Sequence, residues 1–391
     1  MTPPARTQAA IELLDQIVAA ARDGGAAADT LIARYFATRR YAGSGDRRAV
    51  RELVYAAIRA CGKRPTGGRA AMLALAGEDP ALASTFDGSA HGPAAIEAKE
   101  EAAVRGVAPT WLIRALNDSG LGATEMSALT ERAPLDVRVN RLLADPADLG
   151  AALPGAEPIE GLPDALRLPA GTDVAGYAGL VEVQDAGSQA VAFATGAWPD
   201  ERVVDLCAGG GGKTLALVAA MENRGRILAC DTDRGRLQRL PPRAERAGVT
   251  IVETRLLDPG KEADALADWA GTADRVLVDA PCSGTGTWRR NPEARWRLTP
   301  DRLDRLATTQ RQLLRIAAAL VRPGGTLTYV VCSLLDGEGL RQVNTFLAGY
   351  PSWRVDPLEL PFGRAHGAGI RLTPAHDGTD GFFVARLLRP C

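Results

Sequence analysis

The stretch VVDLCAGGGGKT, at residues 203–214, decides the fold of this chain. An apolar run ends in an acid, Asp205, and passes into four consecutive glycines, Gly209 to Gly212. Because glycine has no Cβ, this backbone can turn tightly against a bulky ligand. A strand that leads through such a turn into a helix is typical of α/β sheets, in which ligands bind at the carboxyl ends of the strands.

Two familiar glycine-rich motifs do not fit this stretch. A phosphate-binding GxxxxGK[ST] loop requires glycine where Cys207 stands, and a GxGxxG dinucleotide motif fails because its third glycine falls on Thr214 or Leu215. A strand, an acid and a glycine-rich turn remain, as in enzymes that bind S-adenosylmethionine (AdoMet); a purely structural turn is the alternative. The expected cofactor contacts are Asp205, Cys207, Ala208, Gly209, Gly210, Gly211, Gly212, Lys213 and Asp279.

Strands alternate with helices from residue 199 onward, which predicts a parallel sheet covered on both faces. The second predicted strand ends at Asp231, where a carboxylate can accept hydrogen bonds from ribose hydroxyls. Asp233 is the alternative for this contact. The strands are expected at 202–206, 226–230, 275–279 and 326–331.

A second stretch, VLVDAPCSGTGTWRRNP at 276–292, places Asp279 and Cys282 at the end of a predicted strand. Cys332 ends the strand predicted at 326–331. Neighbouring strands lie about 5 Å apart, so both thiols can face one pocket if these two strands pair. A lone cysteine is more often a small buried apolar residue, but two at matching strand ends favour chemistry.

Two thiols beside an AdoMet methyl group suit alkylation of carbon 5 of a pyrimidine. That carbon becomes nucleophilic once a thiolate has added to carbon 6, and a nearby acid or base must then assist loss of the carbon 5 proton. A free thiol has a pKa of about 8.5 and needs a neighbouring cation, for which Lys213 is a candidate. Asp279 is expected to stabilise the adduct through the ring edge.

Four segments, DLCAGGGGKT, DAPCSGTGTWRRNPEARW, YVVCS and TDGFFVARLL, resemble the Sun/Fmu (RsmB-type) family of RNA cytosine-5 methyltransferases, closest to the bacterial enzymes that modify 16S ribosomal RNA. The resemblance spans about residues 134–391 and implies an α/β, Rossmann-like AdoMet-dependent methyltransferase domain. It implies that Cys332 is the nucleophile and that Cys282 assists product release. It further implies AdoMet contacts from Gly209, Gly211 and Asp231, and cytosine contacts from Lys213 and Asp279.

The sequence departs from the family pattern at two motifs. Gly210 stands where the loop usually has proline, which loosens the turn, and Val331 precedes Cys332 where threonine is common. In the family an acid near the adenine follows the third strand. Within VTIVETRLLDPGKE we choose Asp258 for this contact, with Glu253 as the alternative.

The remainder of the chain predicts three further parts. Apolar residues at three- and four-residue spacing predict a helical domain at 1–80, and the resemblance implies that it is NusB-like and binds RNA. A linker and helical segment is expected at 81–132, with helix from residue 94 onward. A small α+β subdomain is expected at 133–198, starting with a strand at 134–140. The methyltransferase domain is expected at 199–391.

Two arginine-rich stretches are candidate RNA contacts. Residues 34–59 carry a cluster of arginines that can hold phosphates, although the solvated face of an amphipathic helix has the same composition. In WRRNPEARWRLTP, 288–300, tryptophans accompany arginines, which suits an unpaired RNA strand. A helix that packs both tryptophans into a core would look similar. The expected contacts are Arg39, Arg40, Arg47, Arg48, Arg289 and Arg290.

The composition of the chain indicates which disulfides, metal sites and membrane segments to expect. Six scattered cysteines without a CxxC pair, and only three histidines, disfavour a disulfide framework and a metal site. Charged residues interrupt the apolar positions of residues 1–30, so we expect no signal peptide, no membrane span and a cytoplasmic location. A net charge of −1 does not by itself indicate nucleic acid, and we expect a monomer.

The expected function is methyl transfer from AdoMet to carbon 5 of a cytosine in RNA, with 16S ribosomal RNA as the expected substrate and Cys332 as the attacking thiol. Two alternatives stay open. A DNA cytosine-5 methyltransferase would attack with Cys282, which lies in the Pro-Cys pair. A ribosome-assembly factor would bind RNA and AdoMet without turnover.

Overall fold

The computed structural model describes residues 1–391 and divides into two compact units. The helical unit comprises Met1–Arg132 and Thr287–Pro300, and the α/β unit comprises Ala133–Gly286 and Asp301–Cys391. The α/β unit therefore contains both the expected small subdomain and most of the expected methyltransferase domain. The segment 287–300 belongs to the helical unit although it directly follows the DAPCSGTG motif, which we did not predict.

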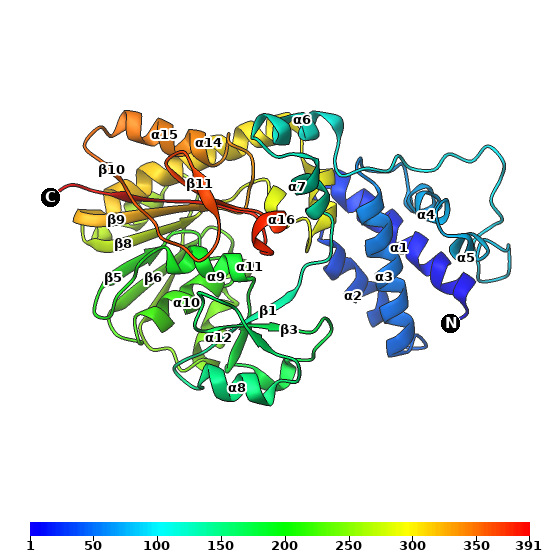
Figure 1. Ribbon diagram of the computed structural model, residues 1–391, viewed down its shortest axis with the longest axis horizontal. Helices are drawn as coiled ribbons and strands as arrows, with labels where there is room; N and C mark the ends of the chain where they lie inside the picture. Colours follow the sequence, from blue (N-terminus) through cyan, green and yellow to red (C-terminus); the bar gives the residue numbers. More distant parts are fainter. The chain divides into compact units, whose positions relative to one another are not determined.

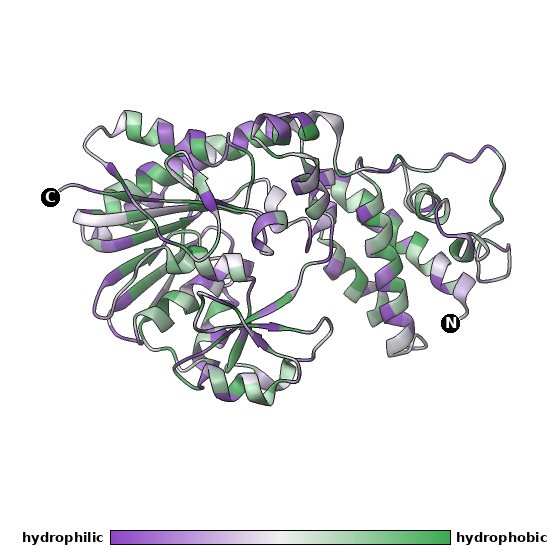
Figure 2. Cartoon of the chain, in the orientation of Figure 1, coloured by the Kyte–Doolittle hydropathy of each residue, from purple (hydrophilic) through white to green (hydrophobic).

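Four helices form the core of the helical unit (Figure 1): α1 (Pro3–Asp23), α2 (Ala28–Ala37), α3 (Ser44–Ala60) and α4 (Gly68–Ala76). Figure 2 shows hydrophobic and hydrophilic residues alternating along them. On α3 the buried residues Val50, Val54 and Ile58 recur every four positions, so one stripe faces the core. Helix α1 begins after Thr2, whose hydroxyl accepts from the Ala5 N–H, and ends at a glycine in the left-handed conformation.

The helical prediction for residues 94–132 is only partly right. The helices that form after α4 are α5 (Pro80–Ala83), α6 (Thr110–Asp118) and α7 (Ala123–Ala128), and residues 94–109 are not helical. Arg69 explains part of this outcome, because its guanidinium donates to the carbonyls of Ala94 and Ala95 and pairs with Glu100. These two carbonyls therefore accept hydrogen bonds from a side chain instead of from the N–H groups of a helix.

A nine-stranded sheet forms the core of the α/β unit, in the order β11-β12-β13-β9-β8-β5-β6-β7 with β10 paired to β13. Its parallel strands are β5 (Arg202–Asp205), β6 (Arg226–Asp231), β7 (Val252–Leu256), β8 (Ala273–Asp279) and β9 (Val321–Val331). The four predicted strands correspond to β5, β6, β8 and β9. The antiparallel edge was not predicted: β10 (Arg354–Asp356), β11 (Arg364–His366), β12 (Gly369–Leu372) and β13 (Phe382–Leu388).

Alternate residues of these strands face two different layers of helices. Val204 and Val276 pack in one cluster with α14 (Pro300–Leu320) and α15 (Leu340–Gly349). Val203 and Leu277 pack in the other with α9 (Ala186–Phe193) and α10 (Gly212–Ala220). This arrangement is the expected Rossmann-like sheet. The strand order reverses at β5, which lies between β6 and β8, so the carboxyl end of β5 is the place to look for a ligand site.

A four-stranded antiparallel sheet, in the order β2-β3-β1-β4, precedes this core. It consists of β1 (Leu135–Val139), β2 (Glu157–Pro158), β3 (Ala165–Leu168) and β4 (Val181–Val183), with α8 (Pro146–Ala152) between β1 and β2. Buried Asp136 on β1 accepts from Arg167 at 2.8 Å and from the Ala186 N–H at 3.1 Å, which ties this sheet to the start of α9.

Short helices complete the chain: α11 (Arg234–Leu237), α12 (Leu240–Arg246), α13 (Glu262–Ala265), α16 (Pro374–Asp377) and the 3₁₀ turns η1 (Ala175–Tyr177), η2 (Ala267–Trp269), η3 (Thr285–Thr287) and η4 (Pro292–Arg297). None of the helices combines the length and the apolar character that crossing a membrane requires.

Candidate active site

The glycine-rich loop follows β5 and leads directly into α10. Gly209 and Gly211 have φ angles of 56° and 86°, a region that favours glycine. A Cβ on Gly211 would lie 2.2 Å from the Leu240 side chain, whereas a Cβ on Gly212 would meet nothing within 4 Å. The loop is therefore packed on one side and open at the first residue of α10.

The loop lacks the usual proline at Gly210, but a side chain from α12 restrains it. Arg243 donates to the Gly210 carbonyl and forms an ion pair of 2.6 Å with Glu182 on β4. We did not predict a role for Arg243, because its two partners lie 33 and 61 residues away in sequence.

Asp231 at the end of β6 is directly connected to the loop. Its carboxylate accepts from the Gly209 N–H at 2.7 Å and from the Asp233 N–H at 2.7 Å. Asp233 is engaged otherwise, since its side chain accepts from the Arg236 N–H and caps α11. A carboxylate has about four lone-pair sites, so Asp231 keeps acceptor capacity for a ligand.

Asp205 at the end of β5 is fully buried. One carboxylate oxygen accepts from the Thr214 hydroxyl at 2.7 Å, and the other has no hydrogen-bond partner. Burial raises the pKa of Asp205 to about 7, against the opposing effect of the Thr214 hydrogen bond, and nearby Asp279 raises it further. Below about pH 7 the folded protein therefore favours the protonated form of this group.

This raised pKa makes stability depend on pH. The unfolded chain releases the Asp205 proton near pH 4, whereas the folded chain keeps it up to about pH 7. The contribution of Asp205 is thus fully present below pH 4 and lost as the pH rises to 7, on the order of 2–4 kcal/mol. Urea unfolding of wild type and Asp205→Asn from pH 4 to 8 measures this. The stability difference between them should shift in favour of the variant as pH rises, and a difference independent of pH would contradict the assignment.

Lys213 and Asp279 form an ion pair of 2.6 Å between the first turn of α10 and the end of β8. Burial alone would lower the pKa of Lys213, but attraction to Asp279, their hydrogen bond and the neighbouring Cys332 leave it above its ordinary value. The ammonium group therefore remains charged beside the thiols.

Cys282 and Cys332 meet at the carboxyl ends of β8 and β9. These strands are parallel neighbours in which Asp279 pairs with Val330, and the two Sγ atoms lie 3.4 Å apart. The prediction that both thiols share one location is confirmed by this geometry. The hydrogen bond with Cys332 raises the pKa of Cys282 well above its ordinary value, and burial and the charge of Cys332 add to this effect.

A close backbone contact supports the loop that carries Cys282. The Gly286 N–H donates to the Cys332 carbonyl at 3.0 Å, and the Gly381 N–H donates to the Gly286 carbonyl at 2.8 Å. A Cβ on Gly286 would lie 2.0 Å from the Gly381 carbonyl oxygen, so this position accepts only glycine. We did not predict this contact.

The other predicted residues of this unit have differing surroundings. Cys207 is half-buried, and burial together with nearby carboxylates raises its pKa well above the ordinary value, so it is an unreactive thiol. Asp258 is exposed just beyond the carboxyl end of β7. Glu253 lies within β7 and pairs with Arg226 and Arg255, which leaves Asp258 as the better candidate. Val331 packs in the core cluster against which Cys282 also packs, whereas Cys332 packs against the cluster on the other face of the sheet.

Several side chains of segment 288–300 are buried, and the RNA contact of Arg289 stays a prediction. Arg289 is 7% exposed, and both tryptophans of the segment are buried, Trp296 within the core of the helical unit. Arg295 is fully buried and donates to the carbonyls of Ile58 and Cys61 at the end of α3, where the last carbonyls of a helix lack the usual bond from four residues on. Arg290 is half-buried, and its RNA contact stays a prediction.

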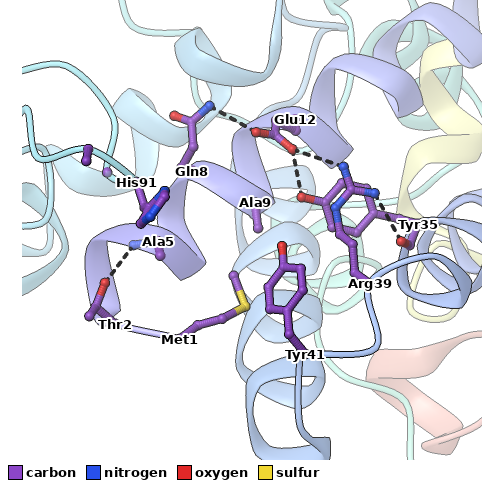
Figure 3. Close-up of a pocket in the computed structure, with 12 residues that line it drawn as sticks. Met1, Thr2, Ala5, Gln8, Ala9, Glu12, Tyr35, Arg39, Tyr41 and His91 are labelled. Carbon is purple, nitrogen blue, oxygen red and sulfur yellow. Dashed lines mark hydrogen bonds and ion pairs between the residues drawn. The ribbon is translucent and has the colours of Figure 1, made fainter.

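The other predicted RNA contacts are more accessible. Arg40, Arg47 and Arg48 are exposed, and Arg39 is half-buried with its guanidinium 3.5 Å from the centre of the Tyr35 ring. Figure 3 shows Arg39 at a cavity of about 870 Å³ whose wall includes Tyr41, 71% exposed. This part of the helical unit combines cations with an accessible aromatic ring.

No group of three or more His, Cys, Asp or Glu side chains in this structure is arranged to hold a metal ion. The candidate site contains the thiol pair, the Lys213–Asp279 ion pair and the carboxylates beside the glycine-rich loop.

Two solved structures resemble the whole chain or most of it. The crystal structure of PH0851 superposes with a TM-score of 0.77 and 25% identity over 99% of both chains. A methyltransferase homolog protein from Pyrococcus horikoshii superposes with a TM-score of 0.60 and 25% identity over 72% of this chain and 99% of the other. Both similarities support the fold described above.

Sequence comparisons identify relatives of the chain. The ribosomal RNA small subunit methyltransferase B of Xanthomonas campestris is 37% identical over 294 residues, which cover 72% of this chain and 66% of the relative. The protein of the same name from Sodalis glossinidius is 33% identical over 309 residues, 76% of this chain and 69% of the relative. The chain thus spans about two thirds of the length of these relatives. Residues 194–388 match the family described as 16S rRNA methyltransferase RsmB/F. The chain therefore belongs to the RsmB/F family.

Proposed function

We propose that this protein transfers a methyl group from AdoMet to carbon 5 of a cytosine in RNA, with 16S ribosomal RNA as the substrate. The observation that carries the proposal is the thiol pair, 3.4 Å apart and beside the Lys213–Asp279 ion pair. The names of the relatives support ribosomal RNA as the substrate class.

The residues at the ends of β5 and β6 fit AdoMet. Asp231 has acceptor capacity for ribose hydroxyls, and the first N–H groups of α10 suit the methionyl carboxylate. Asp205 has a buried oxygen without a partner, and Asp258 is the candidate contact near the adenine. When bound, AdoMet supplies an electrophilic methyl group for carbon 5.

The protein's thiols perform the covalent steps in this proposal. The Cys332 thiolate forms a bond to carbon 6, and the electrons of the carbon 5–carbon 6 double bond shift onto carbon 5, in conjugation with carbon 4 and nitrogen 3, which makes carbon 5 nucleophilic. After methylation a base removes the carbon 5 proton, the double bond re-forms, and the sulfur–carbon 6 bond breaks to return the thiolate to Cys332. The charged Lys213 beside the site stabilises the electron-rich ring, and Asp279 orients this ammonium group.

Cys282 is assigned to the elimination. In the free protein its pKa is raised by the hydrogen bond with Cys332, by burial and by the charge of Cys332. Once the Cys332 sulfur is bonded to carbon 6 as a thioether, its thiol hydrogen bond and its charge are lost. Cys282 then ionises more readily and becomes the base nearest to the adduct.

The direct test of this function is a methyl-transfer assay with tritiated AdoMet. A 16S rRNA transcript and a single-stranded DNA of the same sequence are incubated separately with the protein and digested to nucleosides. We expect label in 5-methylcytidine from the RNA and none from the DNA. Label in DNA would favour the DNA-type enzyme, and AdoMet and RNA binding without any transfer would favour an assembly factor.

The exposed arginines of the helical unit are the proposed contacts to RNA phosphates. Each phosphate contact to a single strand changes the slope of log affinity against log salt by about 0.7, so replacing Arg40, Arg47 and Arg48 together by alanine should flatten the slope by about 2. Filter binding of a 16S rRNA fragment between 50 and 300 mM salt measures the slope. Arg22→Ala is the matched control, because Arg22 is already paired with Asp23 at 2.7 Å. An unchanged slope in the triple variant would place the RNA elsewhere.

A further inference from the structure

One buried carboxylate of the α/β unit is not used by the proposed chemistry. Glu338 lies in the loop after β9 and is 2% exposed. One oxygen accepts from the Ser283 N–H at 2.8 Å and from the Gln310 amide at 3.2 Å. The other accepts from the Ser333 hydroxyl at 2.6 Å and from the Ser283 hydroxyl. All of these donors belong to the same unit.

Two of the residues that donate to Glu338, Ser283 and Ser333, are chain neighbours of the two thiols. Ser283 follows Cys282 and Ser333 follows Cys332, and their hydroxyl oxygens lie 3.1 Å apart. The carboxylate therefore bonds to both strand-end loops at the residues next to the sulfurs.

Additional contacts hold the same loops around the carboxylate. Gln310 on α14 donates to the Pro281 carbonyl at 3.0 Å as well as to Glu338, so the Cys282 loop is held on both sides of the thiol. The Tyr329 hydroxyl on β9 donates to the Glu338 carbonyl at 2.6 Å, which fixes the backbone that presents the carboxylate.

We propose that Glu338 is a positioning residue that keeps Cys282 and Cys332 in contact by joining the two loops that carry them. A carboxyl group this deeply buried is tolerated only when hydrogen-bond partners surround it, and these partners come from both loops and from α14. The loops lie beyond the last ladder hydrogen bonds of β8 and β9, so strand pairing alone does not set the sulfur separation. Glu338 accepts hydrogen bonds from Ser283 and Ser333 and is assigned no contact with the reacting atoms. The carboxylate therefore acts through these two serines.

The role in catalysis rests on the proposed function, but the sulfur contact can be tested without methyl transfer. Phenylarsine oxide bonds to two adjacent thiols: two sulfur–arsenic bonds form, and the two thiol protons leave with the arsenic-bound oxygen as water. Uptake of this probe therefore reports whether the two sulfurs are close. The Cys332→Ala protein gives the background from the remaining cysteines.

Glu338→Ala and Glu338→Gln are compared with wild type for probe affinity, thermal stability, AdoMet binding and methyl transfer. We expect Glu338→Ala to lose at least about 10-fold in probe affinity, because both loops lose the hydrogen bonds that the carboxylate accepts beside the sulfurs. Its kcat should fall about 100-fold with the KM for AdoMet unchanged, since a displacement near 1 Å costs about that factor. Glu338→Gln keeps one carbonyl oxygen that can accept from Ser283 and Gln310. It should therefore retain more of the probe affinity and more of the kcat than Glu338→Ala does.

Asp136→Asn is the matched control, because Asp136 is also a fully buried carboxylate but lies on β1, among partners that include Arg167 and Ala186. It should lower thermal stability and leave probe affinity unchanged. Should Glu338→Ala not fold, Glu338→Gln decides the question alone. Probe affinity equal to wild type in the folded Glu338 variants, or an equal loss in Asp136→Asn, would overturn the proposal.

The two proposals fail in distinguishable ways. Wild type that methylates RNA while the Glu338 variants bind the probe normally would overturn the positioning role and leave the proposed function in place. Probe binding that depends on Glu338 in a protein without methyl transfer would support the positioning of the thiols and overturn the proposed function.

Discussion

Cys282→Ala protein, mixed with AdoMet and a 16S rRNA transcript, is expected to accumulate RNA linked covalently to the enzyme, whereas Cys332→Ala protein should form none. Cys332 makes the bond to carbon 6 in the proposed mechanism, so its loss prevents the adduct. Loss of Cys282 allows the adduct to form but slows its release. Turnover should fall by on the order of 10³-fold or more in both variants, because both steps are obligatory. A denaturing protein gel with labelled RNA measures the adduct.

The control for this experiment is Cys391→Ala, which removes an exposed cysteine outside the thiol pair and should behave like wild type. The reverse pattern, with adduct in Cys332→Ala and none in Cys282→Ala, would make Cys282 the attacker and favour the DNA-type mechanism. The 3.4 Å between the sulfurs places either thiol close enough to the adduct for both roles, so only the chemistry separates them.

Gly286→Ala is expected to have the second largest effect. The added Cβ would lie 2.0 Å from the Gly381 carbonyl oxygen, and both partners are backbone, so the loop that carries Cys282 must move. Overpacking of this kind should lower the free energy of unfolding by about 1–3 kcal/mol. A shift near 1 Å at the thiols should lower kcat about 100-fold. Urea unfolding and the methyl-transfer assay measure the two effects.

Gly337→Ala is the matched control for this substitution, because Gly337 lies in the neighbouring loop and its added Cβ would meet nothing within 4 Å. It should leave stability within about 0.5 kcal/mol of wild type. Normal stability and normal turnover in Gly286→Ala would show that the backbone of this loop can move without affecting the thiols.

Several parts of the fold and site follow from local sequence. Short apolar runs that end in Asp205, Asp231 and Asp279 predict parallel strands whose carboxyl ends meet at one edge. The pairing of Cys282 with Cys332 was predictable for the same reason, since each follows a predicted strand. The short antiparallel strands β10, β11 and β12 escaped prediction, because segments of three or four residues carry little periodicity. The seven-residue strand β13 escaped because its residues are mostly buried and do not alternate with exposed ones.

The arginine-rich segment at 288–300 shows where composition misleads. Arginine beside tryptophan suits an RNA surface, but the same side chains also suit a core in which a guanidinium satisfies helix-end carbonyls, as Arg295 does for α3. Nothing within the segment distinguishes these cases, because the deciding carbonyls lie more than 230 residues away in the chain.

The sequence by itself therefore determined the class of fold, four of the five parallel strands and the residues at their ends, because periodicity and turn residues are local properties of the chain. The tertiary structure alone decided which polar groups are buried and what they bind. The Glu338 cluster, the Gly286–Gly381 contact and the support of the glycine-rich loop by Arg243 all depend on this. Their partners are brought together only when the sheet and its helices have packed, and no local pattern encodes such distant contacts.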